Sequence, residues 1–99
     1  MNEQQQLILT AGLVRGRHEM PVDGYLFDVI ENVLDFDQMR EVLEQRLQNV
    51  SELNLYVTGL TAATVEVMNY CVRNQVRLTL YHFDRESGEY VAQATATRP

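Results

Sequence analysis

Two strand patterns flank a stretch of helical periodicity in the second half of the chain. Residues 53–57 form a short apolar strand pattern, residues 61–74 repeat apolar side chains at helical spacing, and residues 76–83 alternate in period two. Gly59 marks the turn between the first strand and the helix. Strand, helix and strand in this order predict a β-α-β unit, whose crossover makes the two strands parallel neighbours.

The first half predicts two further strands and one helix. Residues 7–13 are an apolar run typical of a buried strand, and residues 14–24, with two glycines and a proline, predict a loop. Residues 25–30 alternate weakly, and we expect a strand there. Asp35 has the character of an N-cap, and the amphipathic helix that follows is expected to end near Asn49.

The helix over residues 61–74 is expected to use Thr61 as its cap. One face carries apolar side chains and would pack against the sheet: Val65, Met68, Cys71 and Val72. The polar side chains would then meet water: Thr64, Glu66 and Arg73.

The C-terminal part predicts a hairpin, with a turn at residues 85–88, Gly88 at a positive φ, and a closing strand to Thr95. The expected fold is therefore a small single α/β domain over residues 1–99, with a mixed sheet in the order β-β-α-β-α-β-β. Residues 1–6 and 96–99 are expected to fray. The expected centre of the core is Leu55, Val57, Leu78 and Leu80.

Composition narrows the classes of function. An apolar content of 45% with 22% charged residues is typical of a folded domain, and 99 residues are few enough that we expect a homodimer. No apolar run approaches the ~20 residues that cross a bilayer, and the N-terminus has no signal-peptide character. The lone Cys71 excludes an internal disulfide and is expected in the core, which fits a cytoplasmic protein.

The net charge of −6 disfavours a long nucleic-acid duplex as partner, because affinity for a duplex comes mainly from neutralising phosphates. All cationic side chains are arginines, whose planar fork suits phosphate or carboxylate but is also common on surfaces. Arg15, Arg17 and His18 lie close together after the first strand and predict a local basic site.

Ligands of parallel sheets sit beyond the carboxyl ends of the strands, where helix N-termini also point their free N–H groups. We therefore expect a small phosphorylated ligand at this edge. The residues predicted to bind it are Arg15, Arg17, Thr58, Gly59 and Thr61. The candidate acids and bases for catalysis are His18, His82 and Asp84.

Each candidate also has a structural interpretation. His18 could be a solvated loop residue, His82 a half-buried core histidine, and Asp84 only the start of a turn. The residues show no zinc spacing, no P-loop and no Gly-x-Ser-x-Gly, so no cofactor is expected. Asp84 together with phosphate oxygens is the one place where Mn²⁺ or Mg²⁺ could be held.

The second half resembles the small CRISPR-accessory ring nucleases, which are related to CARF sensor domains. The matching positions are Gly59, Asp84, Gly88 and Gln93, in less than half of the chain. The resemblance implies a dimer that binds, and cuts between its subunits, a cyclic oligoadenylate messenger of antiviral defence. A phosphodiesterase of this kind would be metal-independent or Mn-dependent.

The chain also departs from that family, because Glu66 stands where the family's helix has a histidine, and Leu60 and Thr61 replace small residues of the turn. Binding of a cyclic nucleotide is thus better supported by the resemblance than its cleavage. The alternative is a protein-interaction module of a mobile element or phage, which would use the exposed sheet edge at residues 89–95.

Overall fold

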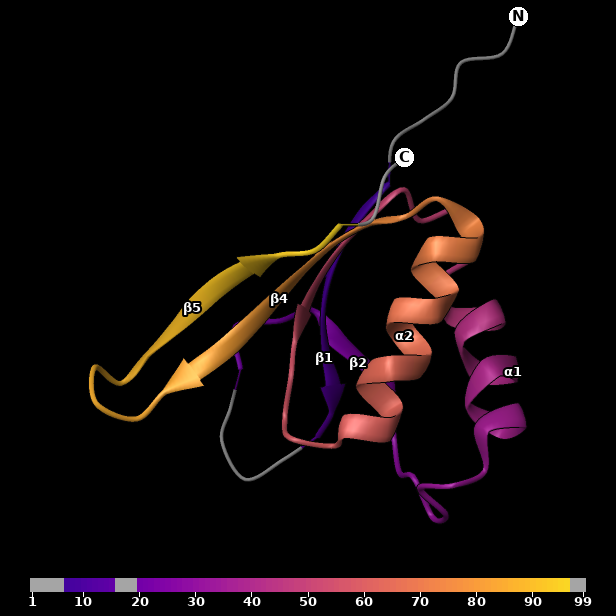
Figure 1. The fold of residues 1–99 in the computed structure, drawn as a ribbon, viewed down its shortest axis with the longest axis horizontal. Coiled ribbons are helices and arrows are strands. Elements are labelled where there is room, and N and C mark those ends of the chain that lie inside the picture. Colours follow the sequence, from indigo (N-terminus) through magenta and orange to yellow (C-terminus); the bar gives the residue numbers. More distant parts are fainter. Residues whose placement is uncertain (1–6, 16–19, 97–99) are drawn as a thin grey trace, which may run out of the picture.

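The computed structural model describes residues 7–15 and 20–96. It contains a five-stranded mixed sheet and two helices in the predicted order, so the expected fold class is confirmed (Figure 1). The elements along the chain are β1 (Ile8–Val14), β2 (Gly24–Phe27), α1 (Phe36–Arg46), β3 (Glu52–Tyr56), α2 (Thr61–Asn74), β4 (Arg77–Asp84) and β5 (Glu89–Ala94). The predictions for residues 1–6 and 97–99 lie outside the described residues.

The strands are ordered β2-β1-β3-β4-β5 in the sheet. β1 pairs in parallel with β2 and β3, β3 pairs in parallel with β4, and β5 closes the sheet antiparallel to β4. The predicted β-α-β unit is therefore β3-α2-β4. Strand β2 is shorter than predicted and begins at Gly24, which pairs with Ala11.

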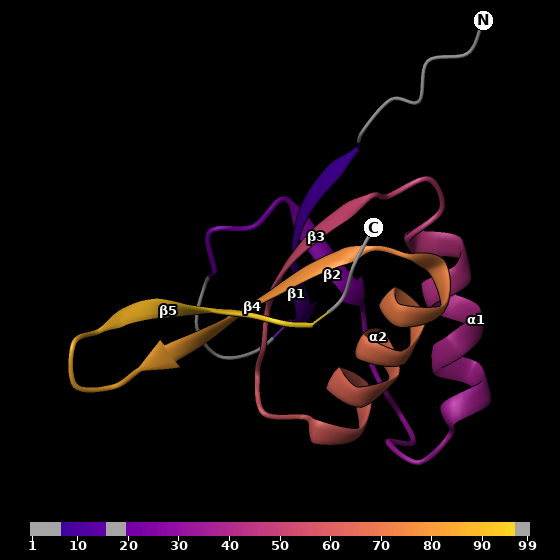
Figure 2. The same cartoon turned by 45° about the horizontal axis from the view of Figure 1, so that its top comes forward.

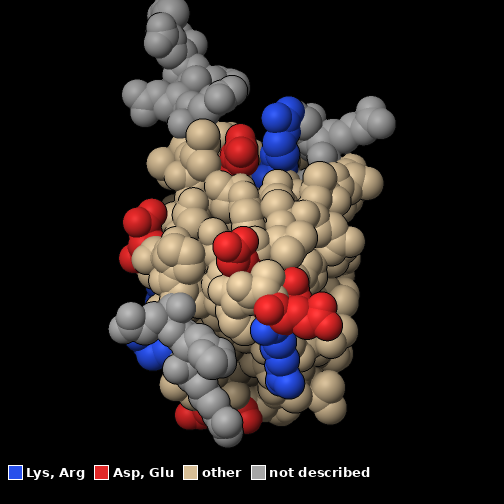
Figure 3. Space-filling view, turned by 90° about the vertical axis from the view of Figure 1, so that its left-hand side faces the viewer, with Lys and Arg blue, Asp and Glu red and all other residues tan. Residues whose placement is uncertain are grey.

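Both helices cover the same face of the sheet, which gives the molecule two layers (Figures 1 and 2). The core lies between the layers and contains three of the four expected central residues, Leu55, Leu78 and Leu80, while Val57 packs at its margin. The view from the side opposite the helices shows a mostly uncharged surface on which acidic side chains and arginines are scattered (Figure 3).

Helix α1 begins as predicted. The Asp35 carboxylate accepts a hydrogen bond from the amide of Gln38 at 3.1 Å, and so satisfies one of the N–H groups that a helix start leaves unpaired. Met39 and Leu43 point into the core. The helix ends at Arg46 instead of near Asn49, which adopts a positive φ of 64°.

Two predictions for helix α2 are wrong. Thr61 is the first residue inside the helix, and Leu60 occupies the cap position without a side-chain hydrogen bond. The buried face is also different: Glu66 is only 8% exposed, while Val65, Met68 and Val72 are 45%, 36% and 66% exposed. The residues that pack inward are Ala63, Glu66, Val67, Tyr70 and Cys71. Apolar side chains occur on two sides of this helix, so periodicity alone did not select the buried one.

The hairpin of β4 and β5 extends beyond the rest of the sheet (Figure 1). Strand β3 ends at Tyr56, which pairs with Tyr81, whereas β4 continues to Asp84 beside β5. Gly88 has the predicted positive φ, 73°, and its amide donates to the Asp84 carbonyl at 2.8 Å. The end of β3 and the projecting hairpin therefore form a step in the sheet.

Candidate functional site

An open groove of about 680 Å³ lies at this step, beside the carboxyl end of β3. Thr58, Gly59 and Leu60 of the β3–α2 turn form one side, and His82 and Arg85 from the hairpin also line it. Three of the predicted site residues, Thr58, Gly59 and His82, therefore lie around one groove. The further lining residues come from β1, the loop that follows it, the position just after β3 and the hairpin: Val14, Met20, Val57, Phe83 and Tyr90.

The charged lining of this groove is cationic. Among the described residues, Arg85 is its one permanently charged side chain and no carboxylate lines it, although the chain contains 14 acidic residues. Arginine is a strong hydrogen-bond donor to phosphate and carboxylate. The groove is therefore suited to an anion.

The N-terminus of α2 also favours an anion beside it, because no side chain of the helix occupies its positive end. Its cap residue Leu60 supplies no side-chain acceptor, and its first turn has no acidic residue. By contrast, α1 has the Asp35 cap and Asp37 in its first turn, so its own carboxylates occupy the positive end of the helix. Gly59, with a φ of 104°, leads the chain into α2 and has no atom within 4 Å of where a Cβ would be.

Thr58 has an unsatisfied hydroxyl. Its Oγ1 atom is buried and makes no hydrogen bond within the described part of the chain. A buried hydroxyl without a partner costs free energy, and such groups are uncommon in folded proteins. The hydroxyl is thus available to a ligand or a water that enters beside the turn.

His82 is exposed and not a core histidine. Its Nε2 atom lies 2.7 Å from Oε1 of Gln93 on the neighbouring strand. If that nitrogen carries the proton it donates to the amide oxygen, and Nδ1 is then the acceptor of the neutral ring. The contact fixes the imidazole at the edge of the groove.

Asp84 has a structural role in the hairpin. Its Oδ1 atom accepts a hydrogen bond from the Glu86 amide at 3.1 Å, a common arrangement of Asp at the start of a turn. Asp84 is half-buried and is not among the groove-lining residues.

Aromatic side chains cover the sheet next to the groove, on the face away from the helices. Tyr56 and Tyr81 are stacked with ring centroids 4.6 Å apart, and Tyr90 meets Tyr56 edge-on at 4.7 Å. Phe83 meets Tyr90 edge-on at 5.3 Å. Burial, followed by the neighbouring Tyr81 and Tyr90, raises the pKa of Tyr56. Tyr90 therefore belongs both to a packed cluster and to the groove wall.

The side chain of Arg15 is directed elsewhere. Its guanidinium carbon lies 4.6 Å from the centre of the Tyr25 ring, in a neighbouring depression of about 550 Å³. That depression also contains Asp23 and Asp28, and among the described residues it shares only Met20 with the groove. Arg17 and His18 lie outside the described residues, so their part in a site stays a prediction.

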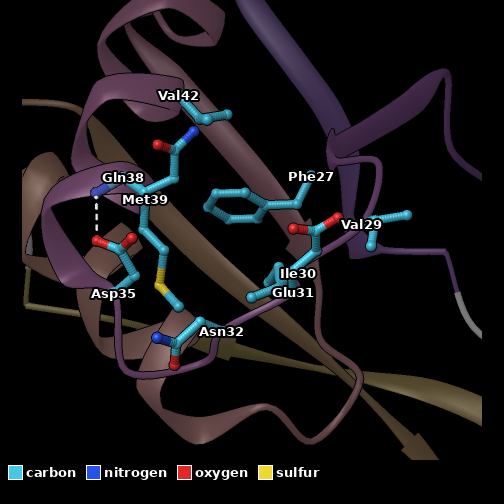
Figure 4. A pocket seen from close by; sticks show the side chains of 9 residues that line it. All are labelled: Phe27, Val29, Ile30, Glu31, Asn32, Asp35, Gln38, Met39 and Val42. Carbon is cyan, nitrogen blue, oxygen red and sulfur yellow. Dashed lines mark hydrogen bonds between the residues drawn. The ribbon is translucent and has the colours of Figure 1, made fainter.

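A third depression, of about 360 Å³, lies between the end of β2 and the start of α1 (Figure 4). Phe27 and Met39 form its apolar interior, and the carboxylates of Glu31 and Asp35 stand at its rim. An acidic rim repels phosphate, which makes this depression the poorer candidate for an anionic ligand.

Within residues 7–15 and 20–96, no cluster of three or more histidine, cysteine or acidic side chains could hold a metal ion. Cys71 is buried as predicted, and burial raises the pKa of its thiol to about 12. None of the helices in the described part of the chain is long and apolar enough to cross a membrane.

The sequence analysis did not predict two of the groove-lining residues, Arg85 and Tyr90. The signal available for Arg85 was its charge, in a turn beside the expected sheet edge.

Comparison of the chain with protein-family models, with curated proteins and with solved structures finds no match.

Proposed function

We propose that this protein binds a small phosphorylated ligand in the groove at the end of β3, and that the ligand is a cyclic nucleotide of the oligoadenylate type. The single observation that carries the anionic part of the proposal is the lining of the groove, whose described residues combine Arg85 and His82 with no carboxylate in a chain of net charge −6. The cyclic nucleotide is suggested by the resemblance at Gly59, Asp84, Gly88 and Gln93.

In the proposed complex, a phosphate lies before the N-terminus of α2. The uncapped amides of its first turn donate hydrogen bonds, and Arg85 supplies the charge on the opposite side. The Thr58 hydroxyl gains the partner that it lacks. Tyr90 offers an aromatic edge to a base.

We propose binding, and not cleavage, as the activity. Cleavage of a phosphodiester needs a positioned acid or base, and His82 is the candidate that lines the groove. Asp84 is already an acceptor in the hairpin turn. A protein that binds the messenger without cutting it would act by sequestering it in the cytoplasm and so weaken an antiviral response.

The test is a thermal-shift titration with cyclic tetra-adenylate, with linear tetra-adenylate and 3′,5′-cyclic AMP as comparison ligands. A ligand that binds the native state at 100 times its Kd adds about 2.7 kcal/mol to the free energy of unfolding, so the melting temperature should rise. Chromatography of the same mixtures shows whether the ring is opened. A melting temperature unchanged by every nucleotide would contradict the proposal and favour the interaction module.

A matched pair of variants locates the site. Arg85→Ala should weaken binding roughly 10- to 100-fold, because a charged hydrogen bond contributes roughly 1.5–3 kcal/mol. Arg77→Ala is the control, since Arg77 is also exposed but starts β4 at the opposite end of the strand. Equal losses in both variants would indicate a general charge effect. Arg15→Ala tests the neighbouring depression in the same way.

A further inference from the structure

The two outer strands of the sheet differ in how their free edges are covered. Beside β2, Arg46 of α1 donates from Nη1 to the Tyr25 carbonyl at 3.3 Å and from Nη2 to Asp28 at 3.4 Å. The edge of β2 is thus partly occupied by the chain's own arginine. In the described part of the chain, β5 pairs with β4 alone, and no helix covers its outer side (Figure 2).

The outward backbone groups of β5 follow from its pairing with β4. The Thr95 amide donates to the Leu78 carbonyl at 3.2 Å, which fixes the phase of the antiparallel ladder. Residues alternate in such a ladder between those that bond the neighbouring strand and those that face away from it. Tyr90, Ala92 and Ala94 therefore turn their N–H and C=O groups to the outside.

β5 has none of the features that usually protect an edge strand. Such strands carry lysine, proline or a bulge, or are very short. The six residues of β5 are regularly paired with β4, and Glu89 at its start is the only charged one. Five of the six are exposed, including Val91 at 54%. An edge of this kind is a template for a further strand.

We propose that β5 pairs antiparallel with β5 of a second copy of this chain, about a two-fold axis at Ala92. In this register Ala92 lies opposite Ala92 of the partner subunit, and Tyr90 lies opposite the partner's Ala94. A large residue thus faces a small one on both sides of the axis, and about six backbone hydrogen bonds form between the outward groups.

Charge is consistent with a second copy in this position. Each chain carries a net charge of −6, so a self-contact must keep its acidic residues apart. In the proposed register Glu89 lies opposite the partner's Thr95, and the two Glu89 carboxylates stand at opposite ends of the paired strands. Like charges do not meet across the axis.

The result is one continuous sheet with five strands from each copy. The pairing assigns a surface to the expected homodimer, and it does not depend on any ligand. It also places the partner next to the groove, because Tyr90 lies both on the paired strand and in the groove lining.

A second exposed apolar surface provides the rival interface. It lies on the outer side of α2 and is formed by three side chains spaced three and four residues apart: Val65, Met68 and Val72. The one acidic residue of α2, Glu66, is buried and does not lie on this surface.

Two variants that each add one lysine distinguish the two surfaces: Ala92→Lys on β5 and Met68→Lys on α2. Both positions are exposed, so the fold should tolerate both changes.

The experiment is sedimentation velocity of the full chain without ligand, at about 50 µM, a concentration that populates dimers of ordinary affinity. The parent and Met68→Lys should sediment as dimers, and Ala92→Lys should weaken dimerisation at least tenfold, because two lysines would face each other across the axis. A monomeric parent, a dimeric Ala92→Lys, or loss of the dimer in Met68→Lys alone would overturn the proposal. Since no nucleotide is present, these outcomes are independent of those of the ligand titration.

A cysteine variant tests the register even if the lysine variant fails to fold. Directly opposite residues that bond each other in an antiparallel pair have Cα atoms about 5.5 Å apart, within the range of a disulfide. Ala92→Cys should therefore form a covalent dimer with copper–phenanthroline on a non-reducing gel. Asn69→Cys, at an exposed position of α2, should not form a covalent dimer. The parent protein, whose Cys71 is buried, shows how much cross-linking occurs without an added cysteine. Equal cross-linking at both positions would contradict the register.

Discussion

The ring of Tyr25 lies directly over Gly12 of the neighbouring strand. A Cβ atom at Gly12 would come within 2.7 Å of the Tyr25 Cδ1 and Cε1 atoms and 3.0 Å from the sulfur of Met20. Gly12→Ala must therefore move the ring, and with it the guanidinium of Arg15 stacked upon it. We expect the free energy of unfolding to fall by about 1–3 kcal/mol in urea denaturation.

Gly24→Ala is the matched control for this prediction. Gly24 lies on the adjacent strand, no atom lies within 4 Å of where its Cβ would be, and its φ is not positive. Its free energy of unfolding should stay within about 0.5 kcal/mol of the parent. Equal destabilisation in both variants would mean that loss of glycine, and not contact with Tyr25, is the cause.

Glu66 is a buried carboxylate whose Oε1 atom has no hydrogen-bond partner in the described part of the chain. Replacing it with an apolar residue of similar length removes this unsatisfied group and keeps the packing volume. Glu66→Met should therefore raise the free energy of unfolding by about 1 kcal/mol or more.

The comparison variant for Glu66 is Glu44→Met, which makes the same change of charge at an exposed position of α1. Its stability should stay within about 0.5 kcal/mol of the parent. If Glu66→Met is instead the less stable of the two, the carboxylate has a favourable partner that geometry does not reveal, such as a bound water.

Ionisation of the Cys71 thiol should make the free energy of unfolding depend on pH in the alkaline range. Burial raises the pKa of its thiol to about 12 in the folded protein, whereas the thiol of the unfolded chain ionises near the ordinary pKa of 9.0. The unfolded state therefore loses its proton first, and the stabilisation present below pH 9 is lost as the pH rises toward 12. Between pH 8 and pH 10 this group should lower the free energy of unfolding by about 1–2 kcal/mol.

Cys71→Ala tests the assignment, because the variant should lose this part of the pH dependence, while the cavity that it creates makes it less stable than the parent below pH 8. The pKa values of Tyr56 and Tyr70 are also raised, so their ionisation adds a similar decline in the free energy of unfolding at higher pH. Parent and variant should therefore be compared below about pH 10, the ordinary pKa of tyrosine. An identical slope in parent and variant would show that the thiol does not contribute.

The end of α2 offers a stabilising change. Gln75 follows the last helical residue with a φ of 58°, a left-handed conformation that glycine adopts without steric cost. Gln75→Gly should raise the free energy of unfolding by about 0.5–1 kcal/mol, measured by thermal or urea denaturation. Asn74→Gly should instead destabilise, since the Asn74 side chain donates to the Tyr70 carbonyl at 3.0 Å. Stabilisation by both would contradict this explanation.

The order of the elements could be predicted because each strand or helix carries a local signal. Gly59 and Gly88 stand at the positive φ values of the turns, and Asp35 caps α1 with its own side chain. The inward face of α2 could not be predicted in this way. It is selected by packing against the sheet, which buries Glu66 while leaving Val65 in water.

The groove was predicted in part. Thr58, Gly59 and His82 follow from the rule that parallel strands end at one edge. The contribution of Arg85 depends on how far β4 continues past the end of β3, which the spacing of residues within either strand does not encode. The direction of the Arg15 side chain likewise depends on Tyr25, a residue on another strand.

The aromatic cluster gives the protein an optical signal of its own. The chain contains no tryptophan, so its near-ultraviolet absorption and emission come mainly from five tyrosines. Three of these, Tyr56, Tyr81 and Tyr90, are in ring contact, and Tyr90 lines the groove. Rings held at fixed angles couple their electronic transitions, so occupation of the groove can be followed by near-ultraviolet circular dichroism of the unlabelled protein.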